Sequence, residues 1–206
     1  MQAFHNENEI EAGVDEVARG CLAGPVYTAA VIWTNEIDPS DTNTILRDSK
    51  KLSKRRRLIL RDYIKEYCLD YSVASSKAEV IDQKNILNAT IDCMHDALDG
   101  LKIDMDHILV DGNRFKIYYR NKKAPVPYTC IKKGDDKYIS IAAASIMAKV
   151  EHDLYIEKLV NNNPELEKYD WLNNMCYGTE KHIQAINEYG LTKYHRKSFG
   201  PCKELF

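Results

Sequence analysis

The sequence predicts an α/β protein in which a sheet flanked by helices is followed by a helical C-terminal region. Residues 10–16 and 26–33 are rich in Val, Ile, Tyr and Thr, as expected for the two strands of a hairpin. Three further strand candidates lie at 68–75, 107–113 and 128–131. Apolar residues recur at helical spacing in three longer segments, at 54–67, 85–98 and 138–160. Strands that alternate with helices in this way are typical of an α/β sheet.

One domain is expected from the chain length. The 206 residues can bury one sizeable core, so we predict a single domain over residues 10–206. Within it, we expect an α/β core at 10–160 and a helical region at 161–206, because Pro164 interrupts the helical pattern near that boundary. The net charge of −2 does not indicate a nucleic-acid partner, which would have to meet local basic patches.

The sequence does not indicate a membrane or secreted protein. No apolar stretch reaches the ~18 residues of a membrane span, and Met1–Glu9 is too polar for a signal peptide. The six cysteines are scattered without a C-x-x-C pair, which indicates reduced thiols and not a disulfide framework or a zinc site. We therefore expect a cytoplasmic protein and, with no sign of oligomerisation, a monomer.

Two adjacent carboxylates, Asp15 and Glu16, stand near the end of the first strand, before a turn of small residues. Successive side chains of a regular strand point to opposite faces. If both acids serve one site, the strand must end or distort there, and the small residues of the turn would allow this. With Arg19 and backbone N–H groups nearby, the acids can hold a divalent metal and a phosphate together. The alternative is an acidic pair at a solvated strand end.

Three arginines, Arg55–Arg57, lie in the first turn of a helix that Ser53 is expected to cap. Positive charge at this place opposes the helix dipole. A sequence that accepts this cost either needs cations beside a phosphate backbone or presents a solvated basic face, and the sequence leaves both interpretations open.

Two further acids follow strand candidates. Asp111 ends an apolar run, as when a buried strand delivers a carboxylate to its carboxyl end, although an Asp before Gly is also ordinary turn chemistry. Asp135 precedes the helix at 138–160, and its neighbour Asp136 is expected to be an exposed carboxylate at the helix start. Residues 151–153 are expected on the solvated side of that helix.

The four acids are expected to gather in one crevice, because the strand ends of an open α/β sheet do so. They are Asp15, Glu16, Asp111 and Asp135. Carboxylates without His or Cys partners suit hard cations such as Mg²⁺ or Mn²⁺. Two such ions about 3.5–4 Å apart can activate a water and stabilise the leaving oxygen of a phosphodiester. A glycosidase-like carboxylate pair fits less well, since it gives no reason for the surrounding Lys and Arg.

The six histidines show no metal-ligand spacing. No Ser-His-Asp arrangement is visible either. His195, between Tyr194 and Arg196, is interpreted as a packing or phosphate-side residue, with an active-site role as the alternative.

Eight motifs together resemble ribonuclease HII, the type 2 ribonuclease H family. The opening motif is Gly13-Val14-Asp15-Glu16-x-x-Arg19-Gly20-x-Leu22-Ala23-Gly24-Pro25-Val26. The others follow in the family's order, as Asp48-Ser49-Lys50-Lys51-Leu52-Ser53, Val110-Asp111-Gly112, Lys133-Gly134-Asp135, Ile141-Ala142-Ala143-Ala144-Ser145-Ile146, Ala148-Lys149-Val150, Tyr177-Gly178-Thr179 and His195-Arg196-x-Ser198-Phe199. The match spans residues 10 to 201, and ordered motifs are far more specific together than any one alone.

The resemblance implies a ribonuclease H-like mixed β-sheet flanked by helices, with a C-terminal helical region. It implies an endoribonuclease that hydrolyses the RNA strand of RNA–DNA hybrids and incises duplex DNA at embedded ribonucleotides. The implied chemistry is two-metal-ion hydrolysis with Mg²⁺ or Mn²⁺, leaving 3′-hydroxyl and 5′-phosphate ends. The implied roles are ribonucleotide excision and RNA-primer removal in DNA replication.

By motif position, the resemblance gives the metal-binding and catalytic roles to the four acids already named. It also implies substrate contacts. Arg19 and Gly20 match part of the backbone segment that reads the 2′-hydroxyl at the RNA–DNA junction. Tyr177 matches a Tyr that packs on the adjacent deoxyribose, and Lys50 matches a phosphate contact. A contact to the 2′-hydroxyl is what allows a protein to distinguish RNA from DNA.

One departure lies in the substrate-binding segment. The family's usual Asp-Glu-Ala-Gly-Arg-Gly reads Asp-Glu-Val17-Ala18-Arg19-Gly20 in this chain. A methyl group at Ala18 restricts the backbone or crowds a ribose if this position requires Gly-only angles or a close approach. Two alternatives therefore stay open: a hybrid-binding protein with weakened cleavage or junction recognition, and a nuclease that cuts DNA only.

Overall fold

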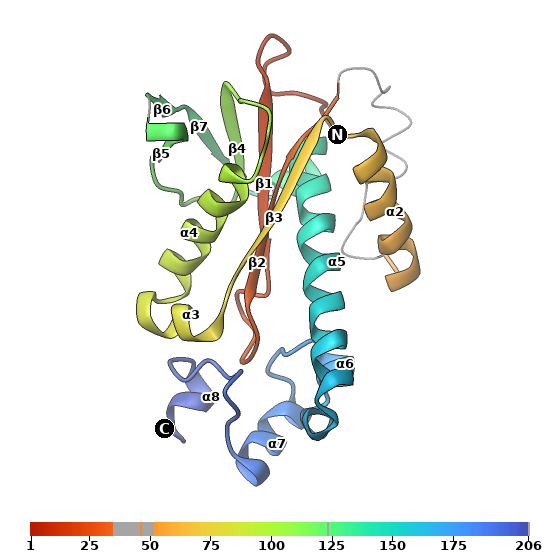
Figure 1. Ribbon diagram of the computed structural model, residues 1–206, viewed down its shortest axis with the longest axis vertical. Coiled ribbons are helices and arrows are strands. Elements are labelled where there is room, and N and C mark those ends of the chain that lie inside the picture. The colour runs from red at the N-terminus through yellow and green to blue at the C-terminus, as the bar shows by residue number, and fades with distance from the viewer. Residues whose placement is uncertain (35–45, 47–51, 123, 206) are drawn as a thin grey trace.

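The computed structural model describes residues 1–34, 46, 52–122 and 124–205. Its main sheet consists of β1 (Glu11–Val17), β2 (Val26–Ile32), β3 (Asp70–Ser76), β4 (His107–Asp111) and β7 (Tyr128–Ile131). The strand order is β3-β2-β1-β4-β7 (Figure 1). β2 pairs antiparallel with β1 and β3, whereas β4 runs parallel to β1 and β7, so the sheet is mixed. A separate hairpin joins β5 (Tyr118–Tyr119) to β6 (Pro125–Val126).

Helices cover both faces of this sheet. α2 (Lys54–Tyr67) and α5 (Ile139–Asn162) lie on one face, and α3 (Ala78–Lys84) and α4 (Ile86–Asp99) on the other (Figure 1). Three shorter helices gather at one end of the sheet, namely α6 (Trp171–Asn174), α7 (Glu180–Tyr189) and α8 (Gly200–Lys203). The 3₁₀ segments are η2 (Arg120–Lys122), η3 (Gly134–Asp136) and η4 (Pro164–Tyr169). None of the helices in the described ranges combines the length and apolar character that crossing a membrane requires.

The long helix α5 lies close against β1 because both surfaces carry small residues at the contact. Gly13 of β1 has no side chain, and a Cβ there would lie 2.3 Å from the carbonyl carbon of Ser140. On α5, Ala142, Ala143 and Ala144 are fully buried. Since side chains alternate along a strand, Asp15 faces α5 on the same side as Gly13.

The opposite face of β1 packs against α4. Ala12 and Val14 join Met94 and Leu98 of α4 in one hydrophobic cluster, together with Val110 of β4. By the same alternation, Glu16 lies on the same face of β1 as Ala12 and Val14 and points toward α4.

The C-terminal region packs against the turn that connects β1 to β2. A hydrophobic cluster joins Cys21, Leu22 and Ala23 of the turn to α5 and to buried residues of the C-terminal region, namely Leu166, Tyr169, Trp171, Cys176, Ala185, Ile186 and Cys202. Backbone hydrogen bonds add to this contact, from Leu22 N to Cys176 O at 2.8 Å and from Gly24 N to Tyr194 O at 2.9 Å. The turn is therefore held by chain segments far away in the sequence.

The predicted strands and longer helices are confirmed, with small differences at their ends. Ser53 caps α2 by accepting a hydrogen bond from the Arg56 amide at 3.3 Å. Helix α3 and the β5–β6 hairpin were not predicted. The helix is a polar seven-residue segment with two buried side chains, and the hairpin strands have two residues each, so neither leaves a clear periodic pattern.

The prediction that residues 151–153 lie on the solvated side of α5 was wrong. His152 and Asp153 are buried. Tyr27 of β2 packs edge-on against the imidazole of His152, with ring centroids 5.9 Å apart, and Arg57 of α2 reaches Asp153. β2 and α2 cover this side of the helix, which the periodicity of 138–160 alone does not reveal.

Candidate active site

A cleft of about 440 Å³ opens where β1 passes into its turn. β1, the turn, α5, α2, β4 and the C-terminal region all contribute to its walls. The lining residues are Asp15, Glu16, Val17, Ala18, Arg19, Gly20, Arg57, Asp111, Ser145, Ile146, Lys149 and Tyr177. All the predicted site residues are among them except Asp135 and Lys50, and Lys50 lies outside the described residues.

Both acids of the pair reach this cleft although β1 neither ends nor distorts between them. β1 stays paired with β2 as far as Val17, whereas its pairing with β4 ends at Val14. Beyond that residue, the β4 side of β1 has an open edge. Asp15 and Glu16 point to opposite faces of the sheet, but both lie along this open edge. They share the cleft because the pairing of β1 with β4 ends before them, and not because β1 itself ends or distorts.

Burial and neighbouring acids dominate the electrostatics of Asp15. Burial raises its pKa well above the usual value, and the charges of Glu16 and Asp111 raise it further. Hydrogen bonds from the Ser145 hydroxyl and the Glu16 amide, the latter at 2.7 Å, oppose this shift. Asp15 is thus a fixed carboxylate in an environment that disfavours its charge.

Glu16 shares part of this environment. Burial raises its pKa, while Arg19, whose Nη1 lies 3.2 Å from Glu16 Oε1, lowers it, and Asp111 raises it. Glu16 also lines a second cavity of about 200 Å³ beside α4. The three acids of the cleft therefore act on one another through their charges.

The segment between β7 and α5 folds back onto Asp111. Gly134 N donates a hydrogen bond to Asp111 Oδ1 at 2.7 Å. A Cβ at Gly134 would lie 2.6 Å from Cδ1 of Ile141, so a larger residue here would require the Ile141 side chain to move. Asp135 follows and is buried, whereas Asp136 is exposed as expected. Asp135 is therefore the residue next to Gly134, which contacts Asp111, but Asp135 does not itself line the cleft.

The donor set suits a hard cation held partly by the substrate. Within the described part of the chain, no three His, Cys, Asp or Glu side chains form a preassembled metal cage. Mg²⁺ is usually bound by one or two carboxylates together with waters and substrate phosphates, and not by an all-protein cage. A divalent cation would also remove the repulsion that raises the pKa of Asp15. The residues therefore fit a magnesium-type ion.

The substrate-binding segment has an unusual backbone. Ala18 has a φ of 69°, in the left-handed region that favours glycine, and it is only 2% exposed. Position 18 therefore has the backbone angles that glycine adopts most easily, and Ala18 adopts them with a side chain present. Ala18 belongs to the hydrophobic cluster around the turn and also lines the cleft.

Tyr177 lies beside this segment. Cys21 and Tyr177 form an antiparallel bridge, and a Cβ at Gly20 would lie 3.9 Å from the Tyr177 ring. The residue is 38% exposed, and burial raises the pKa of its phenol to about 12. Tyr177 therefore places a neutral aromatic ring next to the turn, although it lies 156 positions after Cys21 in the sequence.

Ser145 and Lys149 had no predicted role. Ser145 donates a hydrogen bond to Asp15, and Lys149 lines the cleft. Arg57, one of the three arginines expected either beside a phosphate backbone or on a solvated face, also lines the cleft. A hydroxyl in an otherwise apolar helix segment was the signal for Ser145. The packing interpretation of His195 is confirmed, because it is buried and its Nδ1 accepts a hydrogen bond from Thr192 N at 2.9 Å.

Comparison with known proteins identifies the family. The family model described as ribonuclease HII matches residues 12–202. A ribonuclease HII from Christiangramia forsetii is 49% identical over 199 residues, which are 97% of this chain and 94% of the relative. The ribonuclease H2 from Pyrococcus horikoshii OT3 has a TM-score of 0.77 at 23% identity, covering 95% of this chain and 96% of that chain. Bst-RNase HIII in complex with Mn²⁺ has a TM-score of 0.63 at 18% identity, covering 95% and 68%.

These likenesses agree with the sequence motifs and the geometry. The solved structures confirm the predicted mixed α/β fold. The matched family and the relative from Christiangramia forsetii each extend over nearly the whole chain. The chain therefore belongs to the ribonuclease HII family, the metal-dependent endoribonucleases that cleave the RNA of RNA–DNA hybrids.

Proposed function

We propose that this chain, besides cleaving RNA–DNA hybrids, incises duplex DNA on the 5′ side of a single embedded ribonucleotide and leaves 3′-hydroxyl and 5′-phosphate ends. One observation carries the proposal. Asp15, Glu16 and Asp111 share a single cleft with Tyr177 and the Ala18–Gly20 segment. Groups suited to cutting a phosphodiester therefore lie beside groups suited to recognising the sugar next to it.

In this proposal, Asp15, Glu16, Asp111 and Asp135 hold Mg²⁺ or Mn²⁺, the latter being the ion in the related Bst-RNase HIII structure. When bound, such ions lower the pKa of water and stabilise charge on phosphate oxygens. The chain supplies orientation. Hydrogen bonds from Ser145 to Asp15 and from Gly134 to Asp111 hold both carboxylates in place, so these side chains lose little conformational entropy when a cation binds.

The sugar contacts come from the turn and from Tyr177. Ala18, Arg19 and Gly20 line the cleft, and backbone groups of this segment can bind a 2′-hydroxyl, which is both a donor and an acceptor. The Tyr177 ring offers a flat surface against which a deoxyribose packs and an additional hydroxyl fits poorly. Lys50 remains a proposed phosphate contact.

The alternative is a hybrid-binding protein with weakened cleavage or junction recognition. The left-handed backbone at Ala18 is the observation in its favour. Two observations favour the enzyme. Ala18 packs into the hydrophobic cluster around the turn, and the acids expected for catalysis are all present in the chain. A nuclease for DNA only is disfavoured by the position of Tyr177 beside Gly20.

We also propose a cytoplasmic monomer that acts in ribonucleotide excision and RNA-primer removal. The cysteines support a reducing compartment, because all six are free. Burial raises the pKa of Cys21 to about 12 and that of Cys93 to about 11, as is typical of structural thiols.

The test is cleavage of an RNA–DNA hybrid by Asp111→Asn. The amide oxygen of the variant still accepts the hydrogen bond from Gly134, so the fold is expected to persist while most activity is lost. Asp136→Asn is the matched control, because Asp136 is an exposed acid next to Asp135, and it should cut like the wild type. Full turnover by a well-folded Asp111→Asn would refute the assignment of the acids.

A further inference from the structure

Two basic side chains line the cleft together with the acids. Lys149 of α5 and Arg57 of α2 both line it, together with Asp15, Glu16 and Asp111. The side chain of Lys149 is 28% exposed and that of Arg57 is 18% exposed. Both cations therefore keep a surface that a ligand in the cleft can reach.

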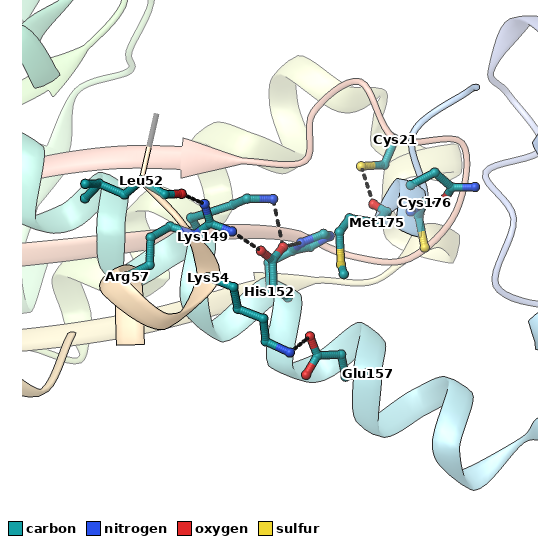
Figure 2. Close-up of polar contacts among 11 residues, drawn as sticks. Cys21, Leu52, Lys54, Arg57, Lys149, His152, Glu157, Met175 and Cys176 are labelled. Atoms are coloured by element: carbon teal, nitrogen blue, oxygen red, sulfur yellow. Dashed lines mark hydrogen bonds and ion pairs between the residues drawn. The ribbon is translucent and has the colours of Figure 1, made fainter. Parts of the chain in front are cut away.

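One buried carboxylate holds the two cations together. Lys149 Nζ lies 2.8 Å from Asp153 Oδ1, and Arg57 Nη2 lies 3.4 Å from Asp153 Oδ2. Figure 2 shows Lys149 and Arg57 reaching from their two helices toward this carboxylate, beside His152. Arg57 is fixed further by a hydrogen bond from Nη1 to Leu52 O at 2.6 Å. The positions of both cations are therefore set before any ligand binds.

The cluster has a net positive charge. Burial lowers the pKa of His152, so its imidazole is neutral at neutral pH. Burial alone would raise the pKa of Asp153, but hydrogen bonds from His152 and Lys149 outweigh it, so Asp153 is ionised. Two cations, one anion and one neutral ring leave one positive charge. A solvated surface pair would not need a carboxylate that is only 5% exposed.

Lys149 lines the same cleft as the Ala18–Gly20 segment and Tyr177, which are the groups proposed to contact the sugar. Cys21 is the bridge partner of Tyr177, and its Sγ donates a hydrogen bond to Met175 O at 3.3 Å (Figure 2). The ammonium therefore shares a cleft with the turn and with the ring proposed to contact a deoxyribose.

We propose that Lys149 and Arg57 form a binding subsite for a backbone phosphate of the duplex in the cleft that Tyr177 also lines, with Asp153 as a positioning residue. This inference rests on the proposed function, since it uses the same cleft. A compact ammonium and a planar guanidinium at fixed positions can both donate to phosphate oxygens. Asp153 itself would not contact the phosphate; it holds the two donors apart at the right spacing.

The salt dependence of binding tests this subsite. Affinity for an RNA–DNA hybrid is measured in EDTA, where cleavage does not interfere, at about 50 and about 200 mM KCl. Replacing one phosphate-binding cation lowers the slope of log affinity against log salt by about 1. Lys149→Met should therefore lose affinity, and its loss relative to wild type should be about fourfold larger at the lower salt concentration.

The matched control is Lys54→Met. Lys54 is also a lysine with an acidic partner, Glu157, and it lies in the first turn of α2 near Arg57, but its side chain is 56% exposed and does not line the cleft (Figure 2). This variant should bind with the wild-type affinity and salt slope. Lys149→Arg, which keeps the charge, should retain most of the affinity.

A double variant separates phosphate binding from a structural role. In Lys149→Met/Asp153→Asn, both members of the closer ion pair lose their charge. Our inference predicts that the melting temperature recovers relative to Lys149→Met while the hybrid affinity stays low. If affinity recovers together with the melting temperature, or if Lys149→Met keeps the wild-type slope, the subsite is refuted. Neither result depends on the catalytic acids, whose assignment is tested separately by the cleavage assay with Asp111→Asn.

Discussion

The side chain of Arg196 binds the backbone of Arg19 across 177 positions of sequence. Its Nη1 donates a hydrogen bond to Arg19 O at 3.0 Å, and its Nε donates one to Gly24 O at 3.0 Å. The Arg196 amide also donates to Leu22 O at 2.8 Å. The guanidinium is fully buried, so one residue near the C-terminus joins both ends of the turn that lines the cleft. The C-terminal region thus sets the shape of the substrate-binding segment.

Arg196→Lys is expected to destabilise the protein and to impair junction recognition. A lysine cannot make the two directed hydrogen bonds at once, and losing one charged hydrogen bond costs about 1.5–3 kcal/mol. Thermal unfolding should show a lower melting temperature, and the remaining folded enzyme should lose more activity on a lone ribonucleotide than on a continuous hybrid. Lys203→Ala, an exposed change on α8, is the control. Equal losses on both substrates would contradict a role in shaping the turn.

Ala18→Gly is expected to change little. Glycine removes a left-handed strain of about 1–2 kcal/mol, but it also loses about 0.8 kcal/mol of methyl burial and about 0.5–1 kcal/mol through greater freedom of the unfolded chain. These terms nearly cancel in the free energy of unfolding. Ala18 packs into the hydrophobic cluster around the turn. Incision at a lone ribonucleotide should therefore stay within about threefold of wild type, the effect expected for about 0.7 kcal/mol. A gain of tenfold or more in this assay would mean that Ala18 weakens junction recognition.

Asp15→Asn is expected to raise the melting temperature of the metal-free protein. Burial, then Glu16 and Asp111, raise the pKa of Asp15 in the folded state, so the folded protein binds this proton more tightly than the unfolded chain. Its stability therefore falls as pH rises from the unfolded pKa toward the folded one. Asparagine avoids this loss. Unfolding at neutral pH with and without Mg²⁺ should show a higher metal-free melting temperature and a smaller rise on adding Mg²⁺. A lower metal-free value than wild type would contradict the electrostatic account.

Acid should destabilise the protein through His195. Burial and then the charge of His182 lower the pKa of His195 from its usual 6.5 to about 4. A lowered histidine pKa gives stability that is complete above 6.5 and is lost as pH falls toward 4. The difference between these two pKa values corresponds to roughly 3 kcal/mol of folding stability. His195→Asn keeps an acceptor for the Thr192 amide, so its melting temperature should fall less steeply with pH over this window than that of the wild type. Parallel curves would show that His195 does not titrate in this way.

Local patterns were sufficient to predict much of the fold. Alternation, short apolar runs and helical spacing predicted the strands of the main sheet and the helices α2, α4 and α5, because these patterns lie within each segment of the sequence. The sequence also predicted that Asp15, Glu16 and Asp111 lie at one cleft, because charged residues at the ends of apolar strands are conspicuous, whereas the metal-binding role of the four acids stays a prediction. The division of the chain near residue 160 stays a prediction.

The remaining features depend on contacts between distant segments. Nothing in the local sequence around Asp153 shows that β2 and α2 cover it, and the tail around Arg196 was described only as basic and aromatic. The partners of Arg196 are backbone carbonyls, which carry no sequence signal. The open edge beyond Val14 depends on where β4 stops pairing. Such features follow from strand register and packing, not from residue type.

The most direct test of the account is cleavage of a DNA duplex that contains one ribonucleotide, next to a full RNA–DNA hybrid and an all-DNA duplex. Each is incubated with Mg²⁺, with Mn²⁺ and with EDTA. A cleft that both cuts and reads the junction predicts incision on the 5′ side of the lone ribonucleotide, cleavage of the hybrid, an intact all-DNA duplex, and no cutting in EDTA. If the hybrid is cut and the lone ribonucleotide is not, or if all-DNA is cut equally well, the proposed reading of the sugar by the Ala18–Gly20 segment and Tyr177 is wrong.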